Sequence, residues 1–321
     1  GFQAVPGVLN ATQAKHVLGV QANVWTEHMP TMAHVLHAVF PRLDALSEVS
    51  WSPAAGNDWH GFLERLPAQL ARYRAQHVRY ADSAFAVDIR TDRNLALATG
   101  KATVTLSDQA GFGDIRYTLD GSAPTPASPR YEAPFEVTLP TTVRAASFAA
   151  DGSALAAPRE RALDRAALLS LAGTELGNCP GSDFRLRLQP TPDAASTQPV
   201  YAVNVFDTCQ SFPPTLMDGV TAIHVDAVRL PRNFALAHEQ KLVVSRPHAT
   251  PFGELVAHAD RCDGPVLATM PLPDPAHGPR EFKLDAKLPA QRGVHSLCLV
   301  YTAPIDGPLH ALDRVSLKTG P

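Results

Sequence analysis

The chain has 321 residues, of which 45% are hydrophobic and 18% are charged, and its formal net charge is −3. This composition is ordinary for a soluble globular protein of two or three domains, and no apolar run reaches the roughly 18 residues that a membrane span needs. Acidic and basic residues are interspersed, so the composition excludes the basic stripe on which nucleic-acid binding depends.

The first 80 residues predict one strand and two helices. Residues 16–24 form a short, mostly apolar run, which is typical of a parallel strand buried on both faces. Residues 32–49 carry apolar side chains mostly three and four positions apart, which predicts an amphipathic helix capped by Thr31 and kinked or split at Pro41. A second helix is expected from residue 58 to about residue 76, with four side chains turned inward: Phe62, Leu66, Leu70 and Tyr73.

An indole and a carboxylate follow the predicted strand, at Trp25 and Glu27. The apolar C–H face of a pyranose stacks on an indole, and its hydroxyl groups donate hydrogen bonds to a charged acceptor, each worth roughly 1.5–3 kcal/mol. The pair therefore indicates a saccharide-binding site. The alternative is that Trp25 is a core aromatic residue and Glu27 a solvated acid favoured by the dipole of the next helix.

Residues 18–27 contain the pattern Gly-x-Gln-x-x-x-Trp-x-Glu, and a Phe-Pro-Arg triplet follows at residues 40–42. Both features, in this order, resemble the last barrel strand and following helix of the family-20 β-N-acetylhexosaminidases. The resemblance implies a fragment of a (β/α)₈ barrel, whose active site lies where the strands end. It implies further that Trp25 forms one wall of the pocket for the terminal N-acetylhexosamine and that Glu27 accepts hydrogen bonds from the O4 and O6 hydroxyls.

The same resemblance implies that the catalytic groups are absent from this chain. In that family the substrate's acetamido oxygen is the nucleophile, and the general acid is the Glu of an adjacent Asp-Glu pair. The sequence contains no Asp-Glu dipeptide, and it begins at Gly1 without an initiator Met or signal segment. We therefore expect a fragment that has no catalytic residue of its own, requires no cofactor and is inactive alone.

Histidines and tryptophans flank this region without suggesting further chemistry. His28, His34 and His37 offer no third ligand in a metal-binding arrangement, so we expect solvated histidines and no metal site. Trp51 and Trp59 flank a loop that resembles the Trp-Ser-Pro closing segment of the same family, and we expect them to pin the two helices to the barrel wall.

Residues 81–165 predict a small β-sandwich. Alternating apolar residues from Phe85 onward predict six or seven short strands, and Asp120-Gly121 predicts a hairpin with a type I′ turn. The string at residues 117–125 resembles the immunoglobulin-like module found after chitobiase and hexosaminidase barrels. We assign this module no chemistry, and expect Tyr117 to be a core residue rather than a platform for sugar.

Residues 166–321 predict a second β module. Alternation of apolar residues predicts strands most clearly at residues 281–284 and 294–301. The strings at residues 254–256, 263–268, 293–299 and 312–315 resemble, in this order, carbohydrate-binding modules of jelly-roll type. The segment has no Trp, and its aromatic candidates are Tyr201 and Tyr301 within strands and Phe206 and Phe212 near a cysteine. A structural module without affinity for glycans therefore remains an equal alternative. Three carboxylates are weak candidates for a calcium site, although none has EF-hand spacing: Asp207, Asp218 and Asp263.

All four cysteines lie in the second half of the chain, at Cys179, Cys209, Cys262 and Cys298. Their spacing matches neither a zinc ribbon nor a CxxC redox motif, and an even number favours two disulfides in an oxidising compartment, periplasmic or secreted. Pairing Cys179 with Cys209 and Cys262 with Cys298 closes loops of only about 30–35 residues and is our preferred connectivity. Four buried free thiols are the alternative.

The resemblance to family 20 implies that the chain is the C-terminal portion of an exo-β-N-acetylhexosaminidase that removes terminal β-linked N-acetylhexosamine. Expected partners are glycans ending in that sugar: chitin oligosaccharides, glycoprotein glycans or peptidoglycan fragments. The alternative is a glycan-binding or structural β-sandwich appendage without a catalytic role.

Overall fold

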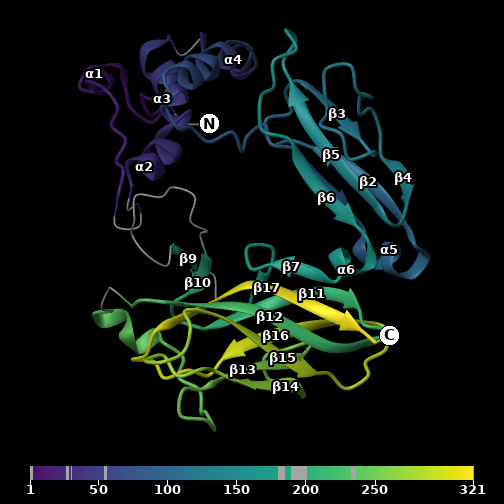
Figure 1. Cartoon of the computed structure of the whole chain (residues 1–321). Coiled ribbons are helices and arrows are strands. Elements are labelled where there is room, and N and C mark those ends of the chain that lie inside the picture. The colour runs from purple at the N-terminus through teal and green to yellow at the C-terminus, as the bar shows by residue number, and fades with distance from the viewer. Residues whose placement is uncertain are drawn as a thin grey trace.

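The computed structural model describes residues 3–26, 29, 31–53, 56–179, 185–188, 201–232 and 236–320, with residues 185–188 described by their backbone. Figure 1 shows three parts: the N-terminal helices, a group of long strands beside them and a larger layered β structure that ends at the C-terminus. No helix of the described residues is long and apolar enough to cross a membrane.

The N-terminal part is helical, and its helices begin where side-chain caps predict. Thr31 Oγ1 accepts a hydrogen bond from the backbone N–H of His34 at 3.1 Å and starts the second helix. That helix ends before Pro41, which separates it from the third, so the predicted break is confirmed. The helices are α1 (Ala11–Ala14), α2 (Met32–Val39), α3 (Arg42–Trp51) and α4 (Trp59–Ala75).

Helix α4 confirms the predicted second helix and its inward face. Asp58 caps its N-terminus through hydrogen bonds from His60 N and Gly61 N. Its buried side chains form a separate cluster with residues from the neighbouring strand region, Phe85 and Leu155 among them. The buried side chains of α4 are Phe62, Leu63, Leu66, Leu70 and Tyr73.

The predicted strand at residues 16–24 does not form, so that prediction is wrong for this chain. Residues 17–26 have no regular secondary structure, and Leu18 and Val24 are 97% and 44% exposed. A strand is stable only when neighbouring strands satisfy its backbone N–H and C=O groups. The described residues place no such neighbour beside this segment.

Six strands follow, arranged in two three-stranded antiparallel sheets with orders β1-β2-β4 and β3-β5-β6. The predicted six or seven short strands are thus confirmed. Along β2 the buried positions alternate strictly with exposed ones, as the period of two requires. The strands are β1 (Asp88–Thr91), β2 (Lys101–Ser107), β3 (Asp114–Thr118), β4 (Phe135–Thr138), β5 (Thr141–Phe148) and β6 (Arg159–Leu163).

Two local predictions in this region are wrong. Asp120-Gly121 does not form a type I′ turn, because that turn needs positive φ at both positions and only Gly121 has it, with φ 82°. The Asp120 carboxylate instead accepts hydrogen bonds from Ser122 N and Oγ in an Asx turn. A short helix, α5 (Arg93–Thr99), also lies among the strands, where the sequence pattern predicted strands only. Its ends carry recognisable signals, because Asp92 caps the start and Gly100 ends it in the left-handed conformation.

The C-terminal part is a β-sandwich. A five-stranded sheet, β14-β13-β16-β11-β8, faces a four-stranded sheet, β15-β12-β17-β7, and β10 pairs with β9 beside them. Every strand predicted here is present. The elements are α6 (Arg165–Leu168), β7 (Ser170–Ala172), β8 (Gly177–Asn178), β9 (Arg185–Leu188), β10 (Tyr201–Asn204), β11 (Cys209–Leu216), β12 (Val220–Leu230), the 3₁₀-helix η2 (His238–Leu242), β13 (Glu254–Ala259), β14 (Val266–Pro271), β15 (Glu281–Lys287), β16 (Val294–Tyr301) and β17 (Leu309–Thr319).

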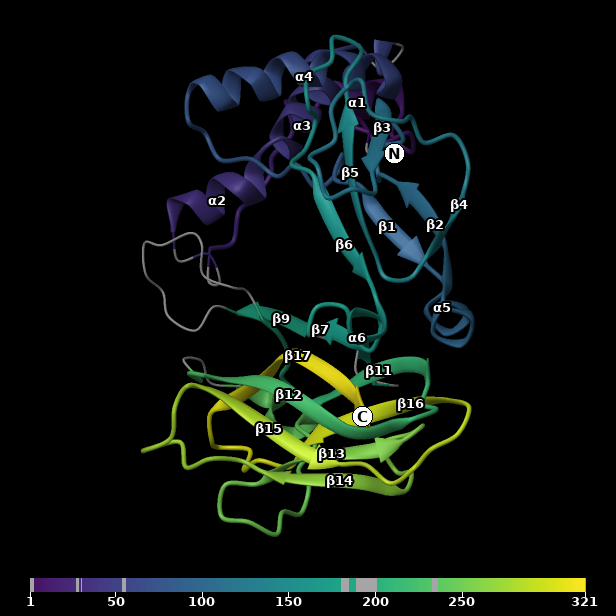
Figure 2. The same cartoon turned by 45° about the vertical axis from the view of Figure 1, so that its right-hand side comes forward.

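One hydrophobic core connects the six-stranded part with the sandwich. A single cluster of buried residues extends from Val87 to Leu317 and includes side chains from both parts. Helix α5 lies at the junction (Figure 2), where the Arg93 guanidinium lies 5.4 Å from the ring centre of Phe212 and donates hydrogen bonds to Leu168 O. The two β parts are therefore held together by apolar packing as well as by their linker.

Candidate functional site

The predicted saccharide site is only partly described. Trp25 lies in the irregular segment before α2, and its side chain is 72% exposed. Glu27 and His28 lie outside the described residues. The structure thus leaves the indole accessible but does not place it relative to the carboxylate.

The exposed position of Trp25 is part of a wider pattern in the N-terminal part. All three tryptophans of the chain lie there, and Trp51 and Trp59 are 90% and 61% exposed. No described segment buries these two side chains, and the expectation that they pin the helices to a barrel wall stays a prediction. Trp59 stacks on Phe62 of its own helix, with ring centres 5.6 Å apart. Large exposed apolar side chains gathered in one region usually mark a surface that packs against another structure.

A groove of about 410 Å³ between α3 and α4 brings two carboxylates near Trp51, but both have partners. Tyr73 Oη donates a hydrogen bond to Asp44 Oδ1 at 2.6 Å, and Arg65 contacts Glu48. Burial raises the pKa of Asp44, and burial together with the hydrogen bond to Asp44 raises the pKa of Tyr73 to about 12, so the phenol keeps its proton and donates. These contacts clamp α3 to α4 and do not form a catalytic carboxylate pair.

A larger cleft, of about 820 Å³, lies where the six-stranded part meets the sandwich. Strands β1, β6 and β17 line it, together with α6 and β7. Its cationic side chains include Arg161, which donates a hydrogen bond to Ile89 O at 2.7 Å, and Arg314, which donates one to Ser170 Oγ at 3.3 Å. None of the residues lining it is aromatic, so the cleft offers no ring on which a sugar would stack.

The aromatic candidates of the two β parts do not form binding platforms. Tyr201 and Tyr301 are each 5% exposed within their strands, and Phe212 is fully buried. Tyr117 stacks on Phe135 with ring centres 4.4 Å apart and packs against the core, as predicted for a core residue. Among the described residues from 81 to 320, no aromatic side chain is exposed.

The three carboxylates considered for calcium are not brought together. Asp207 forms an ion pair with Arg246 at 2.6 Å, and Asp263 forms one with Arg261 at 3.0 Å. Asp218 Oδ2 accepts a hydrogen bond from a backbone N–H at 3.0 Å. Each carboxylate thus serves its own local contact.

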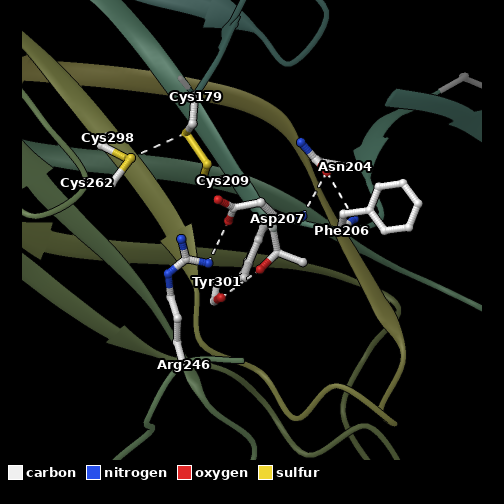
Figure 3. The surroundings of a disulfide bond; sticks show 10 residues. Cys179, Asn204, Phe206, Asp207, Cys209, Arg246, Cys262, Cys298 and Tyr301 are labelled. Atoms are coloured by element: carbon white, nitrogen blue, oxygen red, sulfur yellow. Dashed lines mark hydrogen bonds and ion pairs between the residues drawn. A yellow bond between two sulfur atoms is a disulfide. The ribbon is translucent and has the colours of Figure 1, made fainter. Parts of the chain in front are cut away.

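The four cysteines, by contrast, converge. The structure joins Cys179 to Cys209 and Cys262 to Cys298, which is the pairing with the shorter loops (Figure 3). In the part of the chain that the structure describes, they form the one group of three or more His, Cys, Asp or Glu side chains that gathers with metal-ligand spacing. The sequence spacing gave no indication of this, because residues 30 or more positions apart are brought together by pairing between strands.

Two family models match the chain. Residues 2–54 match the catalytic domain of glycosyl hydrolase family 20, and residues 97–157 match the chitobiase/beta-hexosaminidase C-terminal domain. A beta-hexosaminidase of Porphyromonas gingivalis is 30% identical over 135 residues, which are 42% of this chain and 17% of that protein. A beta-hexosaminidase of Akkermansia muciniphila is 39% identical over 54 residues, 17% of this chain and 11% of that protein. The chain thus spans less than a fifth of the length of either relative.

Solved structures give a weaker likeness. One is a family 6 carbohydrate-binding module from Clostridium cellulolyticum in complex with xylose, with 13% sequence identity and a TM-score of 0.32. The alignment covers 46% of this chain and 95% of the module. A module from Clostridium stercorarium in complex with cellobiose aligns with 47% of this chain and 93% of its own at 8% identity and the same TM-score. In sequence, residues 2–54 are thus similar to a segment of the glycosyl hydrolase family 20 catalytic domain, and residues 97–157 are similar to the chitobiase/beta-hexosaminidase C-terminal domain.

Proposed function

We propose that this chain is the C-terminal portion of an exo-β-N-acetylhexosaminidase that removes terminal β-linked N-acetylhexosamine by substrate-assisted, retaining hydrolysis. The match of residues 2–54 to the family 20 catalytic domain carries the proposal. The exposed Trp51 in the same segment and the exposed Trp59 shortly after it support the proposal, since both are suited to pack against the remaining strands and helices of a (β/α)₈ barrel. Residues 1–80 are assigned to the end of that barrel.

In the proposed enzyme, Trp25 stacks on the apolar face of the terminal sugar and Glu27 accepts hydrogen bonds from its O4 and O6 hydroxyls. The accessible indole of Trp25 supports this role, because a ring that stacks on a ligand is not spent on the protein core. The general acid and the residue that orients the acetamido group come from elsewhere in the barrel, so this chain alone hydrolyses nothing.

The test uses the full-length enzyme and the variant Glu27→Gln, with Glu64→Gln as the matched control at an exposed position on α4. Loss of the charge weakens hydrogen bonds worth roughly 1.5–3 kcal/mol each, so kcat/KM for a chromogenic N-acetylglucosaminide should fall by about tenfold to a hundredfold. The control should keep the activity of the parent enzyme. Equal activity in Glu27→Gln, or turnover by the isolated chain, would refute the proposal.

For the two β parts we propose an immunoglobulin-like sandwich at residues 81–165 and a jelly-roll-like sandwich at residues 166–321, acting as a scaffold beside the barrel. The lack of an exposed aromatic side chain among their described residues favours a scaffold over glycan binding. Co-sedimentation of the whole chain with insoluble chitin or peptidoglycan distinguishes a scaffold from a glycan-binding module, since a scaffold stays in the supernatant.

Two disulfides support a periplasmic or secreted location. The proposed glycans are chitin oligosaccharides, glycoprotein glycans or peptidoglycan fragments.

A further inference from the structure

The four cysteine sulfurs form a single compact cluster rather than two separate crosslinks. All four Sγ atoms lie within 4.8 Å of one another, and Sγ of Cys179 lies 3.6 Å from Sγ of Cys298, across the two disulfides. Figure 3 shows these two sulfurs facing each other, with their bonded partners on either side. Two independent disulfides have no need to meet in this way.

The five-stranded sheet creates the cluster. Cys298 lies in β16, between β11 and β13, where it is paired with Ser211 on one side and His258 on the other. Cys209 begins β11, and Cys179 directly follows β8, the next strand at this edge. The remaining sulfur comes from the turn between β13 and β14. Sulfurs from two strands, from the residue after a third strand and from a turn therefore meet at one place on the sheet.

The cluster lies mostly inside the sandwich, with one sulfur nearer the surface. Three of the cysteines are almost fully buried, with Cys179, Cys209 and Cys298 at 2%, 1% and 3% exposure, and Val300 packs beside them. Cys262 is only partly buried, which leaves one side open to an entering ion or reductant. Buried ligands on paired strands keep their positions, and a shell without water favours sulfur–metal bonds.

We propose that the reduced chain uses these four sulfurs as a tetrathiolate site for a soft divalent cation of the zinc class. Two equivalents of a dithiol reductant, each oxidised to its own disulfide, supply four electrons and four protons, which convert the two disulfides of the chain into four thiols. Binding of one Zn²⁺ then displaces the four thiol protons and forms four Zn–S bonds. The same cluster would thus tie the sheet edge together in both redox states.

The distances agree with this coordination. Zn–S bonds of about 2.3 Å in a tetrahedron place the sulfurs about 3.8 Å apart, close to the 3.6 Å between Cys179 and Cys298. The Cα atoms of the bonded pairs lie 6.0 Å and 5.0 Å apart, and rotation about the Cα–Cβ bonds of the reduced side chains moves the two sulfurs of each pair away from each other. Four thiolates select zinc and similar ions over calcium or magnesium, which prefer oxygen ligands.

The test uses cobalt as a spectroscopic probe for zinc. The whole chain is reduced, freed of reductant under anaerobic conditions and titrated with Co²⁺. We expect one Co²⁺ per chain, with the visible and near-ultraviolet absorption of tetrahedral thiolate coordination, and its displacement by Zn²⁺. Cys262→Ser, at the least buried ligand, should weaken Co²⁺ affinity at least tenfold, since even indirect ligand contacts are typically worth 10- to 100-fold. Val266→Ala, at a 57% exposed position nearby, is the matched control and should bind as the parent does.

A second measurement needs no variant. Alkylation of the reduced parent chain followed by mass spectrometry should modify four thiols without metal and none with one equivalent of Zn²⁺. A reduced chain that holds no stoichiometric Co²⁺, unchanged absorption in Cys262→Ser, or four modified thiols in the presence of Zn²⁺ would each overturn the proposal. Binding that persists after all four thiols are alkylated would overturn it as well.

Discussion

His310 provides a pH-dependent test of the sandwich core. It lies in β17, stacked on Tyr301 with ring centres 5.3 Å apart and edge-on to Phe282 at 6.1 Å. Burial, together with the nearby charge of Arg229, lowers its pKa from 6.5 to about 4. The folded chain therefore keeps the imidazole neutral at a pH where the unfolded chain binds a proton.

The shift sets both the sign and the size of the effect. Because the pKa of His310 is lower in the folded state, its contribution to stability is fully present above pH 6.5 and is lost as the pH falls through 4. The difference between a pKa of 6.5 and one of about 4 amounts to about 3 kcal/mol of stability, of which about 2 kcal/mol is already lost at pH 5.

The assay is urea unfolding of the parent and of His310→Gln, followed by circular dichroism at pH 7, 6 and 5. Between pH 7 and pH 5 the free energy of unfolding should fall by about 2 kcal/mol more in the parent than in the variant, because the variant has no imidazole to protonate. His16→Gln, at an exposed histidine, should follow the parent. Parallel pH profiles of parent and His310→Gln, or an NMR titration of His310 with a midpoint near 6.5, would refute the reasoning.

Three further substitutions test the packing by urea unfolding. Gly253→Ala should lower the free energy of unfolding by about 1–3 kcal/mol more than Gly293→Ala does. Both glycines have φ near +80°, but only at Gly253 would an added Cβ lie 2.6 Å from a facing backbone atom. Equal losses of stability in the two variants would contradict this clash. Asn94→Ala removes two hydrogen bonds from α5 to β11 and should cost about 1–3 kcal/mol, with faster amide exchange in β11 as the second readout; unchanged exchange would contradict it. Leu70→Ala should cost about 2–5 kcal/mol, whereas a loss below 1 kcal/mol would show that α4 is not packed as described.

Elements with a strong local pattern were predictable from the sequence. The spacing of Leu66, Leu70 and Tyr73 predicts α4 and its buried face, and the alternation at residues 294–301 predicts β16 with its exact bounds. In these segments the period of the apolar residues and the tertiary packing agree, so the local pattern is sufficient.

Elements that depend on distant partners were not predictable in this way. The apolar run at residues 16–24 has the composition of a buried strand but stays irregular, because a strand needs neighbours to pair with. At Asp120 the side chain hydrogen-bonds to the following residues and replaces the expected hairpin turn. Helix α5 was missed because its seven residues are too few for the helical period to stand out from the alternation of the strands around it.

The candidate site also has features that the local sequence predicts and features that depend on distant parts of the chain. The residue types at Trp25 and Glu27 indicate saccharide chemistry from the sequence, but how exposed Trp25 is depends on whatever packs around it. The cysteine cluster shows the reverse case, since the sequence spacing conceals a convergence that only the strand order of the sheet creates.

The apolar cluster shared by the six-stranded part and the sandwich has a consequence for evolution and engineering. Exchange of modules between genes succeeds when the crossover falls in a solvated connection, because each piece then retains an intact interior. A crossover near α6 would instead divide one hydrophobic core in two and expose apolar faces of both pieces to solvent. The parts of the chain on the two sides of α6 are therefore expected to be inherited, transplanted or deleted together.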